Sequence, residues 1–235
     1  MKKPLALLLC SAMVVGALVG CGSKKEETKA AETTAETTAE TGESKAAAGS
    51  DKEWIIATDT VFKPFEYTDE SGNFVGIDVD ILAAIAEDQG FKYELQSLGF
   101  DAAAMAVQAG QADAIIAGAT IKQERIDSGW IFSEGYYNAT QTFTVAADSD
   151  IASYEDLSGK NVAVKQGTAG ADFANSLKDE YGFTVTVFED SPSMYQDVIL
   201  GNSAACVEDT PIMASNIKEG GLDLKIPGQI GRAHV

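Results

Sequence analysis

The chain has 235 residues, of which 36 are acidic and 17 basic, giving a formal net charge of -19 at pH 7. Such an excess of negative charge argues against nucleic acid or an anionic membrane surface as the partner. The single histidine, His234, argues against a Ser-His-Asp triad or a multi-histidine metal site. Enzyme mechanisms that depend on histidine are therefore poor candidates, and we expect no cofactor and no metal.

The first twenty residues are typical of a secretory signal peptide. Two lysines precede an apolar run from Leu5 to Val19 that is short for a membrane span and is followed by polar sequence. Leu18-Val19-Gly20-Cys21 resembles the bacterial lipobox, whose cysteine becomes the lipid-modified first residue of the mature protein. We predict a signal peptide over 1–20 and lipidation of Cys21; the alternative is an ordinary signal peptide with an incidental cysteine.

The next segment differs sharply in composition. Residues 22–50 contain no aromatic residue and no Val, Ile, Leu or Met. A segment without such side chains cannot bury a core, so we predict that 21–50 is a lipidated cysteine followed by a disordered tether. From Trp54 onward the composition is globular, and the remaining length suffices for one large domain or two small lobes.

Strand and helix patterns alternate in the first half of the globular part. Four segments are typical of strands: 55–58, 91–96, 112–118 and 140–147. A hairpin turn is expected at 69–73. Asp78 is a candidate cap for a helix that ends at Gly90, and Asp101 for one that ends near Gly110.

The same rhythm repeats in the second half. Three strands are predicted at 161–165, 184–189 and 204–208, and a fourth at 222–226. Helices are expected over about 171–180 and 194–200 and after Pro211. Two successive units of this plan indicate an α/β protein with two lobes, which we place at 51–147 and 148–228.

The chain stops at QIGRAHV without a polar tail or a closing helix. Codons for this string can match a common sequencing adapter. We therefore expect 229–235 to be a non-native tail and the second lobe to be incomplete. Recovery of a longer gene that encodes these residues would refute the hypothesis.

Unusual residues stand where four predicted strands end. They are Asp59, the segment 118–120, Lys165 and the pair Glu208-Asp209. Asp and Thr often cap turns without touching a ligand, so each residue has a purely structural alternative. In open α/β sheets, however, ligands bind outside the carboxyl ends of the strands. The shared position predicts a ligand site.

Arg125 is the one arginine outside the suspected tail, in a chain that otherwise uses lysine for positive charge. Arginine offers a rigid bidentate fork for a carboxylate, which lysine does not. A surface pair with Glu124 or Asp127 is the alternative, although lysine would serve as well there. We interpret Arg125 as a candidate carboxylate ligand.

The segment 167–170 reads Gly-Thr-Ala-Gly and lies between a predicted strand and a predicted helix. Free N–H groups at the start of a helix attract an anion. The segment lacks the Lys-Ser/Thr ending of a phosphate-binding loop. A small carboxylate therefore suits this turn better than a phosphate.

Five separated motifs carry a resemblance to the extracellular amino-acid-binding proteins of ABC importers, the glutamine-binding ones above all. They are ATDTVFKPFEY, NFVGIDVDILAAIA, IIAGATIKQER, VAVKQGT and VEDTPI, within 54 to about 228. The resemblance implies a two-lobe periplasmic-binding-protein-like fold of type II, here without its second hinge crossing and closing first-lobe helices. It also implies a binding protein and not an enzyme, a monomer that captures a free amino acid and works with a permease and an ATPase.

The family pattern also implies which residues read the backbone of the amino acid. Arg125 and the backbone around Thr120 would hold its α-carboxylate, with help from the amides of Thr168 and Ala169. Both charges of such a ligand lose water on binding, so an unpaired charge would be costly.

Asp209, with the Gly118 carbonyl and the Thr120 hydroxyl, would hold the α-ammonium. Some glutamine binders of the family have a histidine before this aspartate, whereas this chain has Glu208. The contact made at that position is therefore open.

The side chain of the ligand would lie between Phe62 and Phe100, with Asp59 and Lys165 at its polar end. Asp59 alone would accept a cation or an amide N–H, whereas Lys165 would repel a cation and donate to an amide oxygen. The pair favours glutamine, with other polar amino acids behind it. If Lys165 points to solvent, a basic amino acid becomes the better prediction.

Two other classes of function stay open. The same fold hosts secreted dehydratases of the cyclohexadienyl or arogenate type, which need a general acid, and Glu208 is the one carboxylate without another role. Related domains also serve as ligand sensors of receptors. A lipid anchor favours the importer and a location on the extracellular or periplasmic face of the cell membrane.

Overall fold

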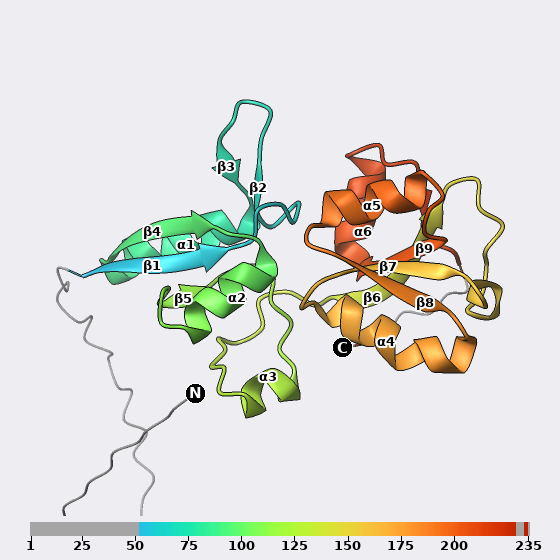
Figure 1. Ribbon diagram of the computed structural model, residues 1–235. Coiled ribbons are helices and arrows are strands. Elements are labelled where there is room, and N and C mark those ends of the chain that lie inside the picture. The colour runs from blue at the N-terminus through green and yellow to red at the C-terminus, as the bar shows by residue number, and fades with distance from the viewer. Residues whose placement is uncertain (1–51, 229–232, 235) are drawn as a thin grey trace, which may run out of the picture. The chain divides into compact units, whose positions relative to one another are not determined.

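The computed structural model describes residues 52–228 and 233–234 of the chain (Figure 1). The predicted signal peptide, the lipidation of Cys21 and the tether over 21–50 lie outside these residues, as does most of the segment 229–235. In the part of the chain that the structure describes, no helix combines the length and the apolar character that crossing a membrane requires.

The first lobe is built on a small parallel sheet. Its strands are β1 (Glu53–Thr58), β4 (Lys92–Ser97) and β5 (Ala114–Ile115), in the order β4-β1-β5. The predicted strands at 55–58 and 91–96 are confirmed. The third is much shorter than the predicted 112–118, because the chain leaves the sheet early and enters the segment that lines the site.

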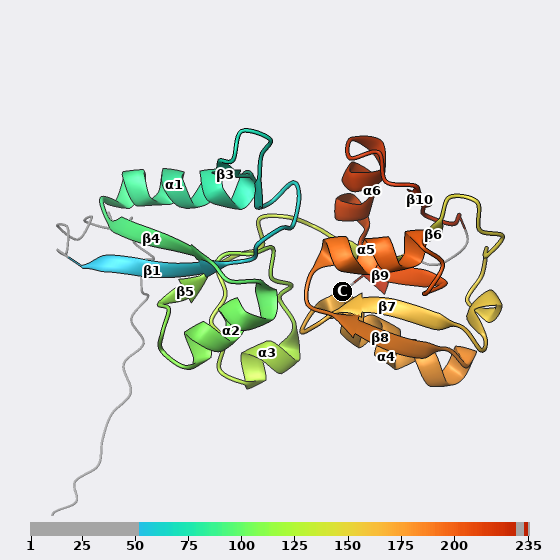
Figure 2. The same ribbon diagram turned by 45° about the horizontal axis from the view of Figure 1, so that its top comes forward.

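Helices cover both faces of this sheet. α1 (Ile77–Gln89) lies on one face and α2 (Phe100–Gln108) on the other, and the short α3 (Gln123–Asp127) lies beside α2 (Figure 2). A hairpin of β2 (Tyr67–Thr68) and β3 (Phe74–Val75) closes over the turn predicted at 69–73. α1 ends at Gly90, as the sequence predicts.

The two predicted aspartate caps are wrong. Gly76 and Gly99 occupy the N-cap positions of α1 and α2, and neither helix has a capping side chain. Asp78 lies inside the first turn of α1, where it is fully buried. Its carboxylate accepts hydrogen bonds from other segments and not from its own helix.

The second lobe contains a mixed sheet in the order β10-β6-β9-β7-β8, and β11 pairs with β6. Strands β7, β8 and β9 run parallel, whereas β6 is antiparallel to β9 and to β10. The bounds are Thr140–Ala146 for β6, Asn161–Lys165 for β7, Thr184–Phe188 for β8, Ala205–Asp209 for β9, Leu224–Lys225 for β10 and Ala233–His234 for β11.

Helices pack on both faces of the second sheet as well. They are α4 (Ala169–Tyr181), α5 (Ser191–Ile199) and α6 (Thr210–Lys218), with a short 3-10 turn, η1 (Glu155–Leu157), before β7. Figure 2 shows α4 on one face and α5 and α6 on the other. Two apolar clusters correspond to these faces, one around Phe143 and one around Met194.

The predicted lobe boundary at residue 147 needs correction. β6 lies in the second sheet, where Gln141 to Thr144 pair with β9, and it makes no pairing with the first sheet. The lobe change therefore precedes Thr140. A strand pattern shows which residues are buried but not which sheet buries them, so the sequence could not place β6.

The two lobes differ in how well they are packed. One buried cluster of the first lobe consists of alanines, among them Ala57 and Ala103, whereas the second lobe buries Phe143, Leu157 and Met194 completely. A hollow of about 1080 Å³ lies along β5 and the segment 128–137. Alanine side chains bury less apolar surface than Phe, Leu or Met, so this cluster gains less stability from burial.

Candidate functional site

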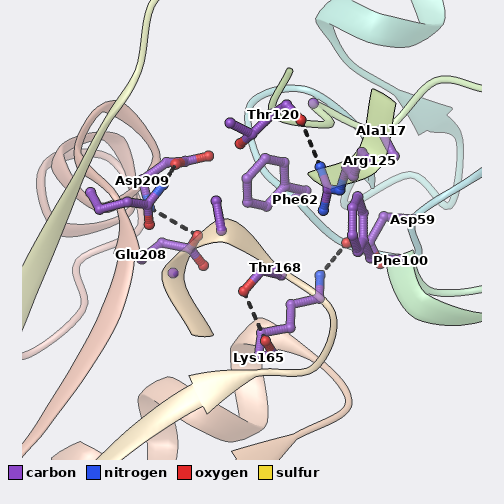
Figure 3. A pocket seen from close by; sticks show the side chains of 14 residues that line it. Asp59, Phe62, Phe100, Ala117, Thr120, Arg125, Lys165, Thr168, Glu208 and Asp209 are labelled. Atoms are coloured by element: carbon purple, nitrogen blue, oxygen red, sulfur yellow. Dashed lines mark hydrogen bonds and ion pairs between the residues drawn. The ribbon is translucent and has the colours of Figure 1, made fainter. Parts of the chain in front are cut away.

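A pocket lies where strands of both sheets end (Figure 3). Its free volume in this structure is about 20 Å³, room for about one water molecule, so an amino acid needs the pocket walls to move apart. All ten ligand-binding candidates of the sequence line it, together with four further residues. The complete lining is Asp59, Phe62, Phe100, Ala117, Gly118, Thr120, Arg125, Gln141, Lys165, Thr168, Ala169, Gly170, Glu208 and Asp209.

Asp59 and Lys165 form an ion pair across the pocket (Figure 3). Asp59 follows β1 in the first lobe, Lys165 ends β7 in the second, and both side chains are almost completely buried. The other Asp59 oxygen accepts the Thr60 amide at 2.7 Å. Lys165 thus points into the pocket and not to solvent, and each charge is compensated within the protein.

Arg125 is held by groups of both lobes. Its Nη1 donates to the Thr120 carbonyl at 2.8 Å, and its Nη2 donates to the Gly167 carbonyl at 2.9 Å. The guanidinium lies 5.2 Å from the ring centres of both Phe100 and Trp130. Burial lowers the pKa of Arg125, which still leaves it protonated at neutral pH. The guanidinium keeps further N–H donors for an anion.

The start of α4 adds backbone donors to the same wall of the pocket. Thr168 is the N-cap residue: its hydroxyl accepts the Ala171 amide at 3.2 Å and donates to the Lys165 carbonyl at 2.8 Å. Ala169 and Gly170 follow at the first helical positions and are buried against the pocket. N–H groups at the first positions of a helix have no acceptor within it, so they favour an anion here.

Asp209 supplies the negative charge facing this donor group. It ends β9, is 9% exposed, and accepts a hydrogen bond from Gln141 Nε2 of the neighbouring β6. Burial, and then the nearby Glu208 carboxylate, raise the pKa of Asp209 to about 7, against the opposing effects of Gln141 and Arg125. A carboxylate that is costly to ionise in the empty pocket gains most from a cation brought by a ligand.

Glu208 is held by three hydrogen bonds. Its Oε2 accepts the Ser191 hydroxyl at 3.0 Å and the Tyr195 hydroxyl at 2.8 Å, and its Oε1 accepts the Asp209 amide at 3.0 Å. Burial raises the pKa of Glu208. These bonds fix the carboxyl beside Asp209, which gives it a structural role that the sequence did not reveal.

Phe62 and Gly118 fit together closely at the first-lobe wall. Gly118 has φ 56°, and a Cβ at this position would lie 2.8 Å from the Phe62 ring. Only glycine combines this backbone conformation with this approach. Phe65, by contrast, does not line this pocket and packs against Phe62 and Tyr137.

Sequence reasoning missed several residues of the site. Gln141 stands in a strand whose other residues are buried, and its contact with Asp209 depends on a long-range pairing. Trp130 lies five positions after Arg125 in an irregular segment, and no motif or strand end in the sequence marks it. Ala117 and Gly170 offer a backbone wall that residue type alone does not identify.

Comparisons with known proteins agree with this architecture. A relative is the arginine-binding extracellular protein ArtP of Bacillus subtilis, 33% identical over 186 residues that cover 78% of this chain and 63% of the relative. The holo ArgBP of T. maritima is 31% identical, with a TM-score of 0.70 and coverage of 78% of this chain and 80% of that one.

A second solved structure is an ancestral arginine-binding protein bound to glutamine, which is 32% identical with a TM-score of 0.69 and covers 77% of this chain and 80% of that one. The same description recurs for a structure bound to arginine. Residues 54–224 match the family model of bacterial extracellular solute-binding proteins, family 3. The chain therefore belongs to family 3 of the bacterial extracellular solute-binding proteins, with the type II fold of its structural relatives.

Proposed function

We propose that this protein captures a free polar L-amino acid, glutamine in the first place, and hands it to the permease and ATPase of an ABC importer. The observation that carries the proposal is one pocket that joins a guanidinium, a helix N-terminus and a buried carboxylate: Arg125, the start of α4 and Asp209. A zwitterion offers one carboxylate and one ammonium, so both of its charges find partners of opposite sign.

Within this pocket, we assign the α-carboxylate to Arg125 and the amides of Thr168 and Ala169. Asp209, the Gly118 carbonyl and the Thr120 hydroxyl receive the α-ammonium. The arrangement agrees with the free donors of Arg125 and with the raised pKa of Asp209.

The proposal of glutamine rests on the other end of the pocket. Asp59 and Lys165 neutralise each other there, so this end offers a donor and an acceptor without net charge, as an amide side chain requires. Phe62 and Phe100 supply apolar walls for the methylene groups.

A basic amino acid is the second candidate. Three carboxyl groups line the pocket against two cationic side chains, Arg125 and Lys165, and the relatives named above include arginine binders. For arginine or lysine to bind, the ligand cation must displace Lys165 from Asp59 or bind beside it. Because burial raises the pKa of Asp209 and of Glu208, the excess of negative charge is smaller than the count of carboxyl groups.

Binding of blocked analogues tests whether the pocket recognises both charges of the zwitterion. Isothermal titration calorimetry should show binding of L-glutamine, loss of at least about a hundredfold for N-acetyl-glutamine, and a similar loss for the glutamine amide that lacks the carboxylate charge, because each analogue leaves one buried charge unpaired. D-glutamine is the matched control for stereochemistry. Equal affinity for the blocked and free forms would overturn the proposal.

The membrane attachment is proposed from sequence alone. Cys21 would carry the lipid and hold the domain at the outer face of the cell membrane. Labelling with a radioactive fatty acid should mark the wild-type protein and not the variant Cys21→Ser, which should be released into the medium. Labelling of both proteins would contradict the assignment.

A further inference from the structure

Beneath the first-lobe wall of the pocket, two buried carboxyl groups face each other. Glu66 lies at the end of the segment between β1 and β2, and Asp78 lies in the first turn of α1. Both residues are 0% exposed. Within residues 52–228, neither oxygen of Glu66 receives a hydrogen bond from a donor group, and the same is true of Asp78 Oδ1.

The remaining oxygen of Asp78 is well served. Asp78 Oδ2 accepts the Gly118 amide at 2.8 Å and the Tyr136 hydroxyl at 3.0 Å. These donors compensate a negative charge on Asp78 and tie α1 to the pocket wall at Gly118. No such donor serves Glu66 among the described residues. The Asp78 amide donates to the Phe65 carbonyl at 2.9 Å, which sets Glu66, the next residue, beside Asp78 and brings the two carboxyl groups together.

Two buried carboxyl groups in contact cannot both be ionised, because their charges would repel one another without solvent to screen them. A proton on one of them removes the repulsion and supplies the missing donor. We propose that Glu66 carries this proton and donates it in a hydrogen bond to Asp78, and that the pair is a positioning device for the amino-acid pocket.

The charges around the pair agree with Glu66 as the protonated partner. Burial, followed by the negative charges of Asp78 and Asp59, raises the pKa of Glu66 to about 10, while Lys165 opposes the shift. Burial also raises the pKa of Asp78, but the Gly118 amide and the Tyr136 hydroxyl act in the other direction. Asp78 is therefore the better place for the charge.

The pair holds three segments under the site. Asp78 binds the Gly118 amide, and the backbone of Glu66 closes the loop that carries Phe62, through a hydrogen bond of 2.6 Å from the Phe62 amide to the Glu66 carbonyl. Phe62 and Gly118 both line the pocket and pack on each other. Ionisation of Glu66 would push this loop away from α1 and separate the two pocket residues. This consequence rests on the proposed amino-acid binding.

The proton itself is tested without any amino acid. Infrared spectra of the ligand-free full chain at about pH 8 should contain a protonated-carboxyl band that is lost in Glu66→Gln and kept in Glu134→Gln, an exposed glutamate that serves as the matched control. In Asp78→Asn the repulsion is replaced by an amide donor, so the band should titrate at lower pH. Absence of a band assignable to Glu66 overturns the proposal even if every variant binds normally.

Thermal unfolding gives an independent readout. The pKa of Glu66 is higher in the folded protein than the ordinary 4.5 expected on unfolding, so its contribution to stability is lost as pH rises from about 4.5 to about 10. Between about pH 7 and about pH 10 the wild type should lose more of its melting temperature than Glu66→Gln, which carries no proton to lose. Parallel decline of the two proteins would contradict the pair.

The effect on the pocket is measured as a ratio of affinities. L-glutamine and L-arginine are titrated into wild type and Glu66→Gln at about pH 7, 8, 9 and 10, because the ratio at each pH cancels the titration of the amino acid's own ammonium group. At pH 7 the affinities of the wild type and Glu66→Gln for the same amino acid should agree within about threefold, since the Gln amide also donates to Asp78. As pH rises, the affinity of the wild type should fall relative to that of the variant. Glu66→Ala should weaken binding about tenfold at every pH.

A constant ratio across the range would overturn the positioning role, as would normal binding by Glu66→Ala. Failure of every protein to bind either amino acid would refute the proposed function instead, and the infrared result would still decide whether the pair holds a proton.

Discussion

At one end of the pocket Asp59 and Lys165 compensate each other. At the other end, among the residues that the structure describes, Arg125 and Asp209 bond only to neutral groups, namely two carbonyls and the Gln141 amide. All four side chains are buried. The charges of Asp59 and Lys165 are therefore paired without a ligand. The charges of Arg125 and Asp209 would be paired only by a bound ligand. We infer that the second end sets how tightly any amino acid binds, and that the first end selects among them.

The largest effect is expected at the end of the pocket that Arg125 and Asp209 form. Arg125→Ala should weaken amino-acid binding by at least about thirtyfold, because removing one partner of a buried charge pair costs roughly 2–5 kcal/mol. Titration calorimetry measures the loss. Lys122→Ala is the control, since its ion pair with Asp172 involves a largely exposed carboxylate and should change affinity less than about threefold. Equal losses of affinity in the two variants would show that the buried charge of Arg125 matters no more for binding than a charge outside the pocket.

The pH dependence of binding should reveal Asp209. Its pKa is raised to about 7 in the ligand-free protein, and in the proposed pose its ionised form would receive the ammonium, so affinity should fall about tenfold per pH unit below this value and level off above it. The sign for stability is opposite: ionising Asp209 without a ligand costs stability, which declines as pH rises from about 3.8 to about 7. Asp209→Asn should flatten both profiles, and an unchanged slope would contradict the assignment.

The substitution Lys165→Met removes the charge of the Asp59–Lys165 pair and keeps a side chain of similar apolar bulk. Asp59 is then a buried carboxylate without its cation, so L-arginine should gain at least about tenfold relative to L-glutamine. Competition of the two amino acids against a radiolabelled ligand measures the ratio. A ratio that stays at the wild-type value would show that this end does not select.

A smaller loss is expected from Trp130→Leu. The indole supports one face of the Arg125 guanidinium, and such contacts are worth about 0.5–1 kcal/mol, or roughly two- to fivefold in affinity. Trp54→Leu is the matched control because Trp54 is partly exposed on β1, away from the pocket lining. A loss as large as that of Arg125→Ala would mean that Trp130 does more than orient the guanidinium.

Much of the fold follows from local pattern. The buried runs of β1 and β7 and the glycine that ends α1 were predicted because burial period and cap chemistry are local properties. The pocket candidates were brought together by one topological rule, that parallel strands end at the same edge of a sheet. Asp59, Lys165 and Asp209 follow this rule directly.

What the pattern could not supply depends on long-range contacts. β6 reads as a buried strand in either lobe, and only its pairing with β9 assigns it to the second. Asp78 resembles a helix cap in sequence, yet its partners Gly118 and Tyr136 lie some forty to sixty positions further on. Gln141 and Glu208 likewise act through neighbours that the fold supplies.

The most direct test of the account is a titration of L-glutamine and L-arginine into the wild-type chain and Lys165→Met at about pH 7.5. The wild type should prefer glutamine, the variant should shift toward arginine, and Arg125→Ala should bind neither amino acid well. Wild-type protein that prefers arginine with Lys165 in place would contradict the claim that the Asp59–Lys165 pair selects the ligand.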